Sequence, residues 1–269
     1  MLMDLAGKRV VLTGAGGGIG HQMALQLARK GARLLLVDRS QERLDEVGAE
    51  VRAAHGVAET LTVDLGQMDS HQQVVDAARR EFGGIDVLIN NAGILAFVAY
   101  EEQDPAQIAA IMNVNATAAM LLTRAALPHM LAQNSGRIVN IGSTFGSIGF
   151  PHFAAYSASK FAIRGFSEAL RRELADTGIG VTFVSPRATR TAINTDAVNR
   201  MLAKTGANTD TPQQVAAQAV QAIESERKDC YIGWSESFFA RLNGILPRLV
   251  DGGLRKQARI ARAYAKPAR

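Results

Sequence analysis

The feature that most constrains the fold is a regular alternation of short apolar runs, rich in β-branched residues, with longer helical patterns. The run RLLLVD (33–38) has no polar residue between its ends, as expected of a strand buried on both faces of a sheet. Strands that alternate with helices pair in parallel, so the pattern predicts an α/β fold, a doubly wound parallel sheet of about seven strands with helices on both faces. We predict strands over 9–14, 33–38, 58–65, 85–93, 136–143, 180–186 and 229–234, and long helices over 105–132 and 155–177.

The chain of 269 residues, 47% of them apolar, can bury a sizeable core and has room for one large α/β domain or two small ones. No linker, internal repeat or low-complexity segment divides it. We therefore expect a single domain over residues 1–234, followed by an extension over 235–269 that comes after the last predicted strand.

Cysteine and histidine usage argues against two kinds of site. The one cysteine, Cys230, excludes an intramolecular disulfide and a cysteine-based zinc site. The five histidines are scattered, with no H-x-x-x-H pair, so we expect no metal site. The first residues do not resemble a signal peptide, and no uninterrupted apolar run reaches the roughly 18 residues of a membrane span. We therefore expect a cytoplasmic protein.

The net charge of +5 is unevenly distributed. Residues 241–269 contain eight Lys or Arg and one acid, Asp251, which leaves the rest of the chain near neutral. A near-neutral body argues against a nucleic-acid-binding protein built around a basic face. The basic end of the chain requires a separate explanation.

A glycine-rich segment, TGAGGGIG (13–20), lies between the first predicted strand and the first predicted helix. Glycines there let the backbone turn tightly and approach a pyrophosphate, which the helix N-terminus attracts. The spacing of Gly14, Gly18 and Gly20 differs from the strict G-x-G-x-x-G pattern, and a glycine-rich turn without a ligand is the structural alternative. The dinucleotide-binding interpretation makes the predicted sheet a Rossmann-type sheet.

Asp38 ends the second predicted strand, the next strand after the glycine-rich segment. An acid at this point accepts hydrogen bonds from the ribose hydroxyls of a bound dinucleotide. Its carboxylate would repel the 2′-phosphate of NADP, so we expect NAD. The adjacent Arg39 could attract that phosphate, so NADP is not excluded, and a solvated strand-end Asp is the structural alternative.

The segment YSASK (156–160) places Tyr156 and Lys160 one turn apart on one face of a predicted helix. A fixed positive charge lowers the pKa of a phenol toward neutral pH, so the pair fits a tuned acid/base. A packed Tyr beside a solvated Lys is the structural alternative, and the pair alone does not decide between them.

Together these motifs resemble the short-chain dehydrogenase/reductase family, in its common subtype. The resemblance covers roughly residues 7–233 and rests on motifs in the right order. They are T-G-x-x-x-G-I-G (Thr13–Gly20), N-N-A-G (Asn90–Gly93) and Y-x-x-x-K (Tyr156–Lys160). Two single residues complete the set: Ser143 precedes Tyr156 at the spacing of the family's active-site serine, and Asn115 precedes Pro128 at the spacing of its active-site asparagine.

The resemblance implies an NAD(P)-dependent oxidoreductase acting on an alcohol or ketone. It implies that Tyr156 is the general acid/base and that Lys160 lowers the tyrosine pKa and holds the nicotinamide ribose. Ser143 would donate a hydrogen bond to the developing oxyanion, and Asn115 would hold a water that connects Lys160 to solvent. The cofactor-binding residues that we expect are Gly14, Gly18, Ile19, Gly20, Asp38, Arg39, Asp64, Leu65, Asn91, Tyr156, Lys160, Pro186 and Thr191.

One of these assignments comes with an alternative, and one lies near a departure from the family pattern. Asp64 resembles the acid whose segment contacts the adenine, but a strand-end cap is an equally good interpretation. Thr191 falls where the family's Thr contacts the carboxamide. Shortly before it the chain departs from the family, because Arg187 replaces the Gly of a Pro-Gly pair. We expect Arg187 to point to solvent, and the alternatives are contact with the cofactor pyrophosphate or with an acidic substrate.

The end of the chain is the second departure. VDGG (250–253) matches a segment that ends many family members, but it follows FFARLNGILPRL, and we interpret it as a coincidence. The extension 235–269 resembles tails of members that act on lipidic substrates or lie at membranes. We favour a helix packed over the substrate pocket or a neighbouring subunit, with a solvated basic face, and peripheral contact with an anionic membrane is the alternative.

The substrate pocket is predicted between 147–153 and a lid over 191–211, both rich in bulky apolar residues. This favours a hydrophobic alcohol or ketone. The alternatives are an NADPH-dependent 3-oxoacyl thioester reductase and a non-catalytic dinucleotide-binding protein. By resemblance, the helices over 105–132 and 155–177 pair across a two-fold axis, so we expect a homodimer or homotetramer.

Overall fold

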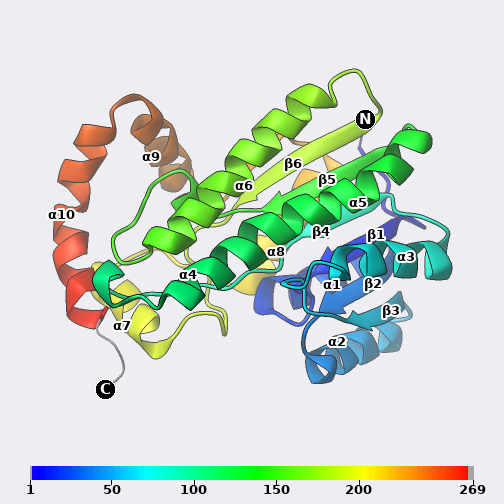
Figure 1. Cartoon of the computed structure of the whole chain (residues 1–269), viewed down its shortest axis with the longest axis horizontal. Coiled ribbons are helices and arrows are strands. Elements are labelled where there is room, and N and C mark those ends of the chain that lie inside the picture. Colours follow the sequence, from blue (N-terminus) through cyan, green and yellow to red (C-terminus); the bar gives the residue numbers. More distant parts are fainter. Residues whose placement is uncertain (1, 266–269) are drawn as a thin grey trace.

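The computed structural model describes residues 2–265 and confirms the predicted doubly wound sheet. All pairings are parallel, in the order β3-β2-β1-β4-β5-β6-β7 (Figure 1). The order reverses between β1 and β4, the point at which sheets of this kind bind ligands at the carboxyl ends of their strands. The strands are β1 Arg9–Thr13, β2 Arg33–Asp38, β3 Val57–Thr62, β4 Val87–Asn90, β5 Gly136–Ile141, β6 Ile179–Ser185 and β7 Asp229–Tyr231.

Helices cover both faces of the sheet (Figure 1). One face carries α1 Gly18–Arg29, α2 Gln41–Ala53 and α8 Pro212–Glu224; the other carries α3 Ser70–Phe82, α4 Pro105–Met112, α5 Ala118–Ala132 and α6 Ala154–Glu173. The second strand shows why its sequence is apolar throughout. Leu34 and Leu36 pack in the core beneath α1, whereas Leu35 and Val37 pack beneath α3.

The predicted helix over 105–132 contains a π-helical turn, Asn113–Thr117, between α4 and α5. By length and composition the run Pro105–Ala132 is the one helix in residues 2–265 able to cross a membrane. We expected no such run because polar residues interrupt it. Within the run, Leu122, Ala126 and Met130 are buried against the sheet, so it is a core helix of this fold.

Buried side-chain hydrogen bonds fix α5 and α6 to the sheet. Asn90 on β4 donates to Thr123 on α5 at 3.1 Å and to Asn140 on β5 at 2.8 Å. Asn140 in turn donates to Ser167 on α6 at 2.8 Å. Each buried polar group would cost free energy if left unpaired, so these bonds set the positions of both helices relative to the strands.

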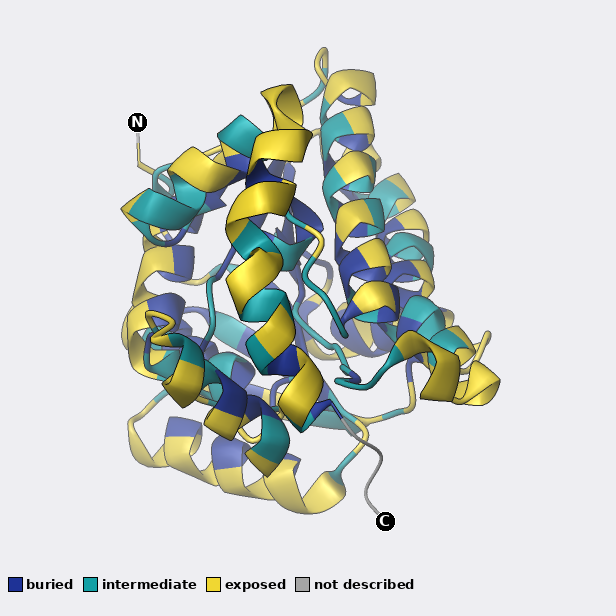
Figure 2. Cartoon of the chain, turned by 90° about the vertical axis from the view of Figure 1, so that its left-hand side faces the viewer, coloured by how far each residue is buried: buried dark blue, intermediate teal, exposed yellow. Residues whose placement is uncertain are grey.

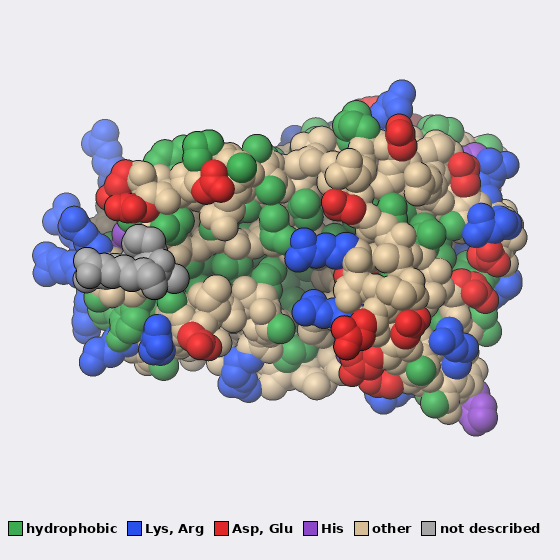
Figure 3. All heavy atoms as spheres, turned by 60° about the horizontal axis from the view of Figure 1, so that its bottom comes forward, with side chains coloured by type: hydrophobic (Ala, Val, Ile, Leu, Met, Phe, Trp, Pro, Cys, Tyr) green, Lys and Arg blue, Asp and Glu red, His purple; other side chains and the backbone are tan. Residues whose placement is uncertain are grey.

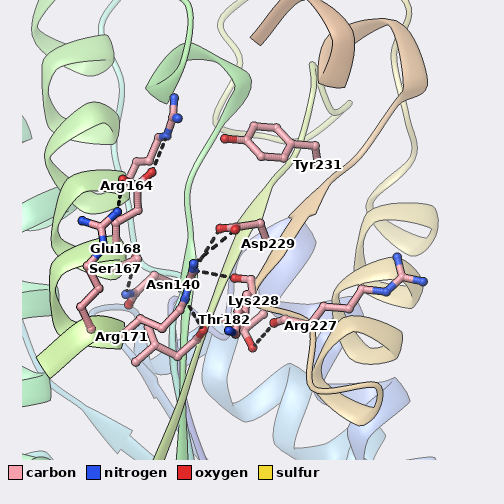
Figure 4. A network of polar contacts seen from close by, with 12 residues as sticks. Asn140, Arg164, Ser167, Glu168, Arg171, Thr182, Arg227, Lys228, Asp229 and Tyr231 are labelled. Atoms are coloured by element: carbon pink, nitrogen blue, oxygen red, sulfur yellow. Dashed lines mark hydrogen bonds and ion pairs between the residues drawn. The ribbon is translucent and has the colours of Figure 1, made fainter. Parts of the chain in front are cut away.

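A second polar network attaches the edge strand β7 to α6 (Figure 4). The Arg171 guanidinium donates to both carboxylate oxygens of Asp229 and to the Lys228 carbonyl. Arg164 donates to Glu168 and to the Ser147 hydroxyl, which also bonds to the Tyr231 hydroxyl. Because α9 follows β7 closely in the chain, this network also fixes where the C-terminal helices begin.

The C-terminal helices lie at one end of the molecule, beyond the carboxyl ends of the strands (Figure 1). They are α9 Trp234–Ile245 and α10 Pro247–Tyr264, and α10 packs against α7 Asp196–Thr205. Most of α10 is exposed (Figure 2). The VDGG segment lies within α10, so it does not end the chain here. Residues 266–269 of the predicted extension lie outside the described part of the chain.

Candidate active site

The glycine-rich turn after β1 packs tightly against the segment after β4. Gly14 has a φ of +64°, and a Cβ there would lie 2.8 Å from the Ala92 Cα. A Cβ on Gly20 would collide with the Gly14 carbonyl oxygen. The Asn91 side chain donates to the Thr13 and Gly14 carbonyl oxygens, each at 3.0 Å. These contacts require glycine at both positions and fix the turn at the reversal point of the sheet.

The N-terminus of α1 opens toward the same edge. Gly17 precedes the helix, and no side chain caps its first N–H groups. A Cβ on Gly18 would lie 2.9 Å from Thr191 Cγ2, so glycine leaves space between the helix and the segment after β6. Exposed N–H groups on a helix N-terminus, beside a backbone without side chains, fit the pyrophosphate of a dinucleotide.

Asp38 lies beside this turn at the end of β2. Its carboxylate accepts hydrogen bonds from the Gly16 N–H at 3.0 Å and from the Ser40 N–H at 3.2 Å. Arg39 is exposed. Sequence reasoning missed Arg43, whose Cβ lies 2.6 Å from where a Cβ on Gly16 would be. The sequence signal that could have found it is its place in the first turn of α2, shortly after Asp38 and Arg39.

Asp64 and Leu65 have different environments. The exposed Asp64 accepts a hydrogen bond from the Gly66 N–H at 2.9 Å, which is the local turn that the structural alternative describes. Leu65 is buried in the core under α3. Asn113, in the π-helical turn, donates to the Gly66 carbonyl at 2.8 Å and so holds this segment against α4.

Ser143, Tyr156 and Lys160 meet where β5 ends and α6 begins. The Ser143 side chain lies close enough to the Tyr156 hydroxyl to lower the pKa of the phenol, and its hydroxyl accepts from the Phe145 N–H at 3.1 Å. The Lys160 Nζ donates to the Ile141 carbonyl at 2.9 Å and lies 5.8 Å from the centroid of the Tyr156 ring. The predicted serine, tyrosine and lysine are therefore brought together.

Burial is the largest influence on the pKa of both titratable groups. It raises the pKa of Tyr156, and the Ser143 side chain acts in the opposite direction. Burial lowers the pKa of Lys160 to about 8. The Lys160 ammonium donates to the Ile141 carbonyl, which holds it on the Tyr156 side of α6.

Asn115 occupies the π-helical turn and is buried. Its side-chain oxygen accepts from the Ile94 N–H at 2.8 Å, and its side-chain nitrogen donates to the Ile94 carbonyl at 2.8 Å and to Ser159 at 3.0 Å. Gly93 separates it from Lys160, because a Cβ there would lie 3.3 Å from the Asn115 oxygen and 3.6 Å from the Lys160 Nζ. Asn115 therefore belongs to the same cluster, with its side chain holding the segment after β4.

We call the glycine-rich turn after β1 and the N-terminus of α1 the nucleotide edge of the sheet. One cleft of about 150 Å³ joins this edge to the cluster around Tyr156. Its lining includes the predicted residues Ile19, Asn91, Ser143, Tyr156, Lys160, Pro186 and Thr191. The other predicted residues, Gly14, Gly18, Gly20, Asp38, Arg39, Asp64, Leu65 and Asn115, do not line it. Phe145, Phe153, Met201 and Leu202 give the cleft an apolar wall beside Tyr156.

The expectation that Arg187 points to solvent is wrong. Its guanidinium donates to both carboxylate oxygens of Asp210, at 2.9 and 2.8 Å, and lies 3.5 Å from Glu236 at the start of α9. Asp210 is buried, with 6% of its surface exposed, and a buried carboxylate requires a cation. Sequence reasoning missed Asp210 and Glu236, because nothing local in the sequence links them to Arg187.

The site has a glycine cradle at a helix N-terminus, a carboxylate at the end of the second strand, and a Ser-Tyr-Lys group at the end of the fifth. These features define a dinucleotide-binding α/β oxidoreductase. Residues 8–202 match the short chain dehydrogenase family, and on this match the chain belongs to the short-chain dehydrogenase/reductase family.

Relatives and solved structures agree with this assignment. The chain is 38% identical over 232 residues to the ketoacyl reductase HetN of Nostoc, covering 86% of this chain and 80% of that protein. It is 32% identical over 248 residues to human estradiol 17-beta-dehydrogenase 11, covering 91% and 81%. A short chain dehydrogenase/reductase of Burkholderia phymatum in complex with NAD superposes with a TM-score of 0.84 at 26% identity, covering 93% and 97%.

Proposed function

We propose that the protein is an NAD-dependent oxidoreductase that interconverts a hydrophobic secondary alcohol and its ketone. The observation that carries the proposal is that Ser143, Tyr156 and Lys160 line one apolar-walled cleft together with Ile19 of α1. A phenol in that position can exchange a proton with a substrate oxygen, and the apolar wall fits a hydrophobic substrate body.

The bound dinucleotide supplies or accepts the hydride. In the reducing direction, Tyr156 gives its proton to the carbonyl oxygen, and in the oxidising direction it removes the alcohol proton. The Ser143 hydroxyl donates a hydrogen bond to the same oxygen as negative charge develops. Lys160, next to Tyr156, holds the ribose end of the cofactor. Asn115 holds the Ile94 backbone and Ser159 in place around this group.

Asp38 supports NAD over NADP, because its carboxylate is fixed beside the glycine turn by the Gly16 and Ser40 N–H groups. We would titrate the protein with NADH and NADPH. Tighter binding of NADH is expected, and Asp38→Asn should weaken NADH binding about tenfold while strengthening NADPH binding. The exposed acid Asp45 on α2 provides the matched control, Asp45→Asn. If NADPH binds more tightly than NADH to the unmodified protein, the NAD assignment fails.

A second candidate is an NADPH-dependent 3-oxoacyl thioester reductase. The similarity to HetN supports it, as do Arg39 and Arg43, two exposed cations near Asp38 where a 2′-phosphate would lie. The two candidates give opposite results in paired assays. Oxidation of secondary alcohols with NAD supports the first, and reduction of a 3-oxoacyl thioester with NADPH supports the second.

We also propose a homodimer or homotetramer formed through α5 and α6. Their outer surface has an apolar hollow of about 300 Å³, and Leu131 beside it is 44% exposed. Exposed apolar surface between two long helices fits a helical interface. Light scattering on a gel-filtration column should give a multiple of 28.7 kDa, the mass of one chain. Leu131→Glu should shift the mass toward one chain, and Leu2→Glu, also at an exposed leucine, should not.

We propose further that the protein is cytoplasmic and contacts anionic membranes through α9 and α10. Trp234, Phe238 and Ile245 are exposed by 86%, 52% and 77%, and Lys and Arg side chains gather at this end of the molecule (Figure 3). Bulky apolar groups beside cations suit a lipid surface.

Sedimentation with phosphatidylserine vesicles tests the membrane contact. Arg255→Glu with Arg259→Glu on α10 should reduce the bound fraction several-fold. The matched reversal of Arg79 and Arg80, two exposed cations on α3, should leave it unchanged. If the unmodified protein does not sediment with the vesicles, the membrane proposal fails.

A further inference from the structure

A second cavity lies between the cleft and the C-terminal helices. It measures about 730 Å³, is open on one side and is lined by α7, α9, α10 and the loop after β5; we call it the extension chamber. Most of its lining is apolar, including Phe145, Phe150, Phe239, Leu242 and Leu254. Its size lies within the range of sites that bury most of a drug-sized ligand. Helices α9 and α10, which line one side of it, lie outside the segment 8–202 that matches the family model.

The extension chamber and the catalytic cleft adjoin each other. They share Thr144, Phe145, Arg187, Ala188, Met201 and Leu202 as lining residues. Phe145 also lies edge-on to the Tyr156 ring, with ring centroids 6.4 Å apart, and stacks on Phe150 at 4.9 Å. A continuous aromatic surface therefore leads from the proposed acid/base into the chamber, past the flexible side chains of Met201 and Leu202.

The face of α10 toward the chamber is formed by a single row of residues at helical spacing. Val250, Gly253, Leu254 and Gln257 recur at helical spacing, and all of them line the cavity. Gln257 is the polar member: its Oε1 atom is buried and has no hydrogen-bond partner among residues 2–265. The rest of the row is apolar or glycine, so α10 presents a mainly apolar surface to the chamber.

We propose that the extension chamber binds the aliphatic chain of a long-chain secondary alcohol or ketone whose oxygen lies at Tyr156. This rests on the proposed function and adds the substrate class. The chain passes Phe145 and Met201 and runs along this row of residues on α10. Phe239 and Leu249, which line the chamber, are 49% and 62% exposed, so its mouth opens at the apolar surface of α9 and α10.

Two glycines provide a matched pair of variants. A Cβ on Gly253 or on Gly244 meets nothing within 4 Å, so both helices accept a larger side chain without a backbone clash. Gly253 lines the chamber and Gly244 does not. Gly253→Phe therefore occupies part of the chamber, while Gly244→Phe makes the same chemical change on the neighbouring helix.

The activity test measures NAD-dependent oxidation of 2-alkanols from 2-butanol to 2-tetradecanol. In the unmodified protein, kcat/KM should rise about three- to fourfold per methylene over the middle of the series, as apolar burial predicts. Gly253→Phe should lower kcat/KM for the longest alcohols at least tenfold and leave 2-butanol within twofold. Gly244→Phe should behave as the unmodified protein. Turnover without dependence on chain length overturns the chamber assignment and leaves the proposed function intact.

A binding test separates this inference from the proposed function. The fluorescence of cis-parinaric acid, an eighteen-carbon chain probe, reports binding without turnover. Gly253→Phe should weaken its binding at least tenfold relative to Gly244→Phe. Equal binding by the two variants overturns the inference, whatever the activity. Loss of binding in Gly253→Phe alone supports the chamber even if no alcohol is oxidised, a result that would reject only the proposed function.

Discussion

The nucleotide edge of the sheet and the C-terminal extension hold their side chains in different ways. At the edge, buried hydrogen bonds fix the backbone, as where Asn91 binds both the Thr13 and Gly14 carbonyl groups. The extension is held by apolar contacts around Ala261 and by the ion pair between Arg187 and Glu236. Proton and hydride transfer need fixed distances, whereas an apolar chain tolerates variation in its surroundings. This difference fits the two proposals, which place proton transfer in the fixed region and substrate selection in the apolar one.

The largest effect should come from Tyr156→Phe, which removes the proton donor from the fixed side. Turnover should fall about 10³-fold or more, since a positioned acid/base contributes roughly 10²–10⁴-fold and its hydroxyl is lost entirely. Affinity for NADH should stay within a few-fold. Tyr100→Phe, at a tyrosine that is 61% exposed, provides the control. Retained turnover in Tyr156→Phe would reject the acid/base role.

The second effect concerns pH. The pKa of Lys160 is lowered to about 8 by burial, below its value in the unfolded chain. Between about pH 8 and the unfolded pKa of about 10.4, the unfolded state binds more protons, so this group makes the free energy of unfolding rise with pH across that window. The rise is at most roughly 3 kcal/mol. Urea titrations at several pH values should show it in the unmodified protein, and Lys160→Met should lack it.

The third effect tests the tight glycine packing. Gly20→Ala places a methyl group against the Gly14 carbonyl and should lower the free energy of unfolding by roughly 1–3 kcal/mol, as overpacking does. Cofactor binding should weaken with it. Gly165→Ala is the matched change in a helix, because a Cβ there meets nothing within 4 Å, and it should raise stability by up to about 1 kcal/mol. If the two variants had the same free energy of unfolding, the tight packing of the turn around Gly20 would be contradicted.

The smallest effect tests how far the two regions are independent. Arg187→Met leaves Asp210 buried without its cation and should cost about 1–2 kcal/mol of stability, mostly recovered in the double variant with Asp210→Asn. Affinity for NADH should change less than threefold, because Arg187 pairs with Asp210 and Glu236. A tenfold loss of NADH affinity would show that the extension and the nucleotide edge are coupled.

The sequence allowed most of the fold and the meeting of Ser143, Tyr156 and Lys160 in one cleft to be predicted, because both depend on local patterns. Strand-helix alternation predicted the sheet, and short motifs predicted Ser143, Tyr156 and Lys160. The pairing of Arg187 depends on Asp210 and Glu236, 23 and 49 residues away in the chain, and no local pattern reports such a contact. The extension chamber could not be predicted for the same reason, since α7, α9 and α10 contribute to it from separate segments.

Helix α10 contains adjacent glycines, Gly252 and Gly253, and no side chain caps its first turn. Each glycine costs the helix about 1 kcal/mol relative to alanine, so α10 depends on its packing against α7 to stay folded. Such a segment opens on its own, with a smaller free energy than global unfolding, and its amide hydrogens should exchange faster than those of α6. An aliphatic chain bound in the extension chamber would contact α10 and slow that exchange. Substrate binding would then be thermodynamically coupled to the local folding of α10.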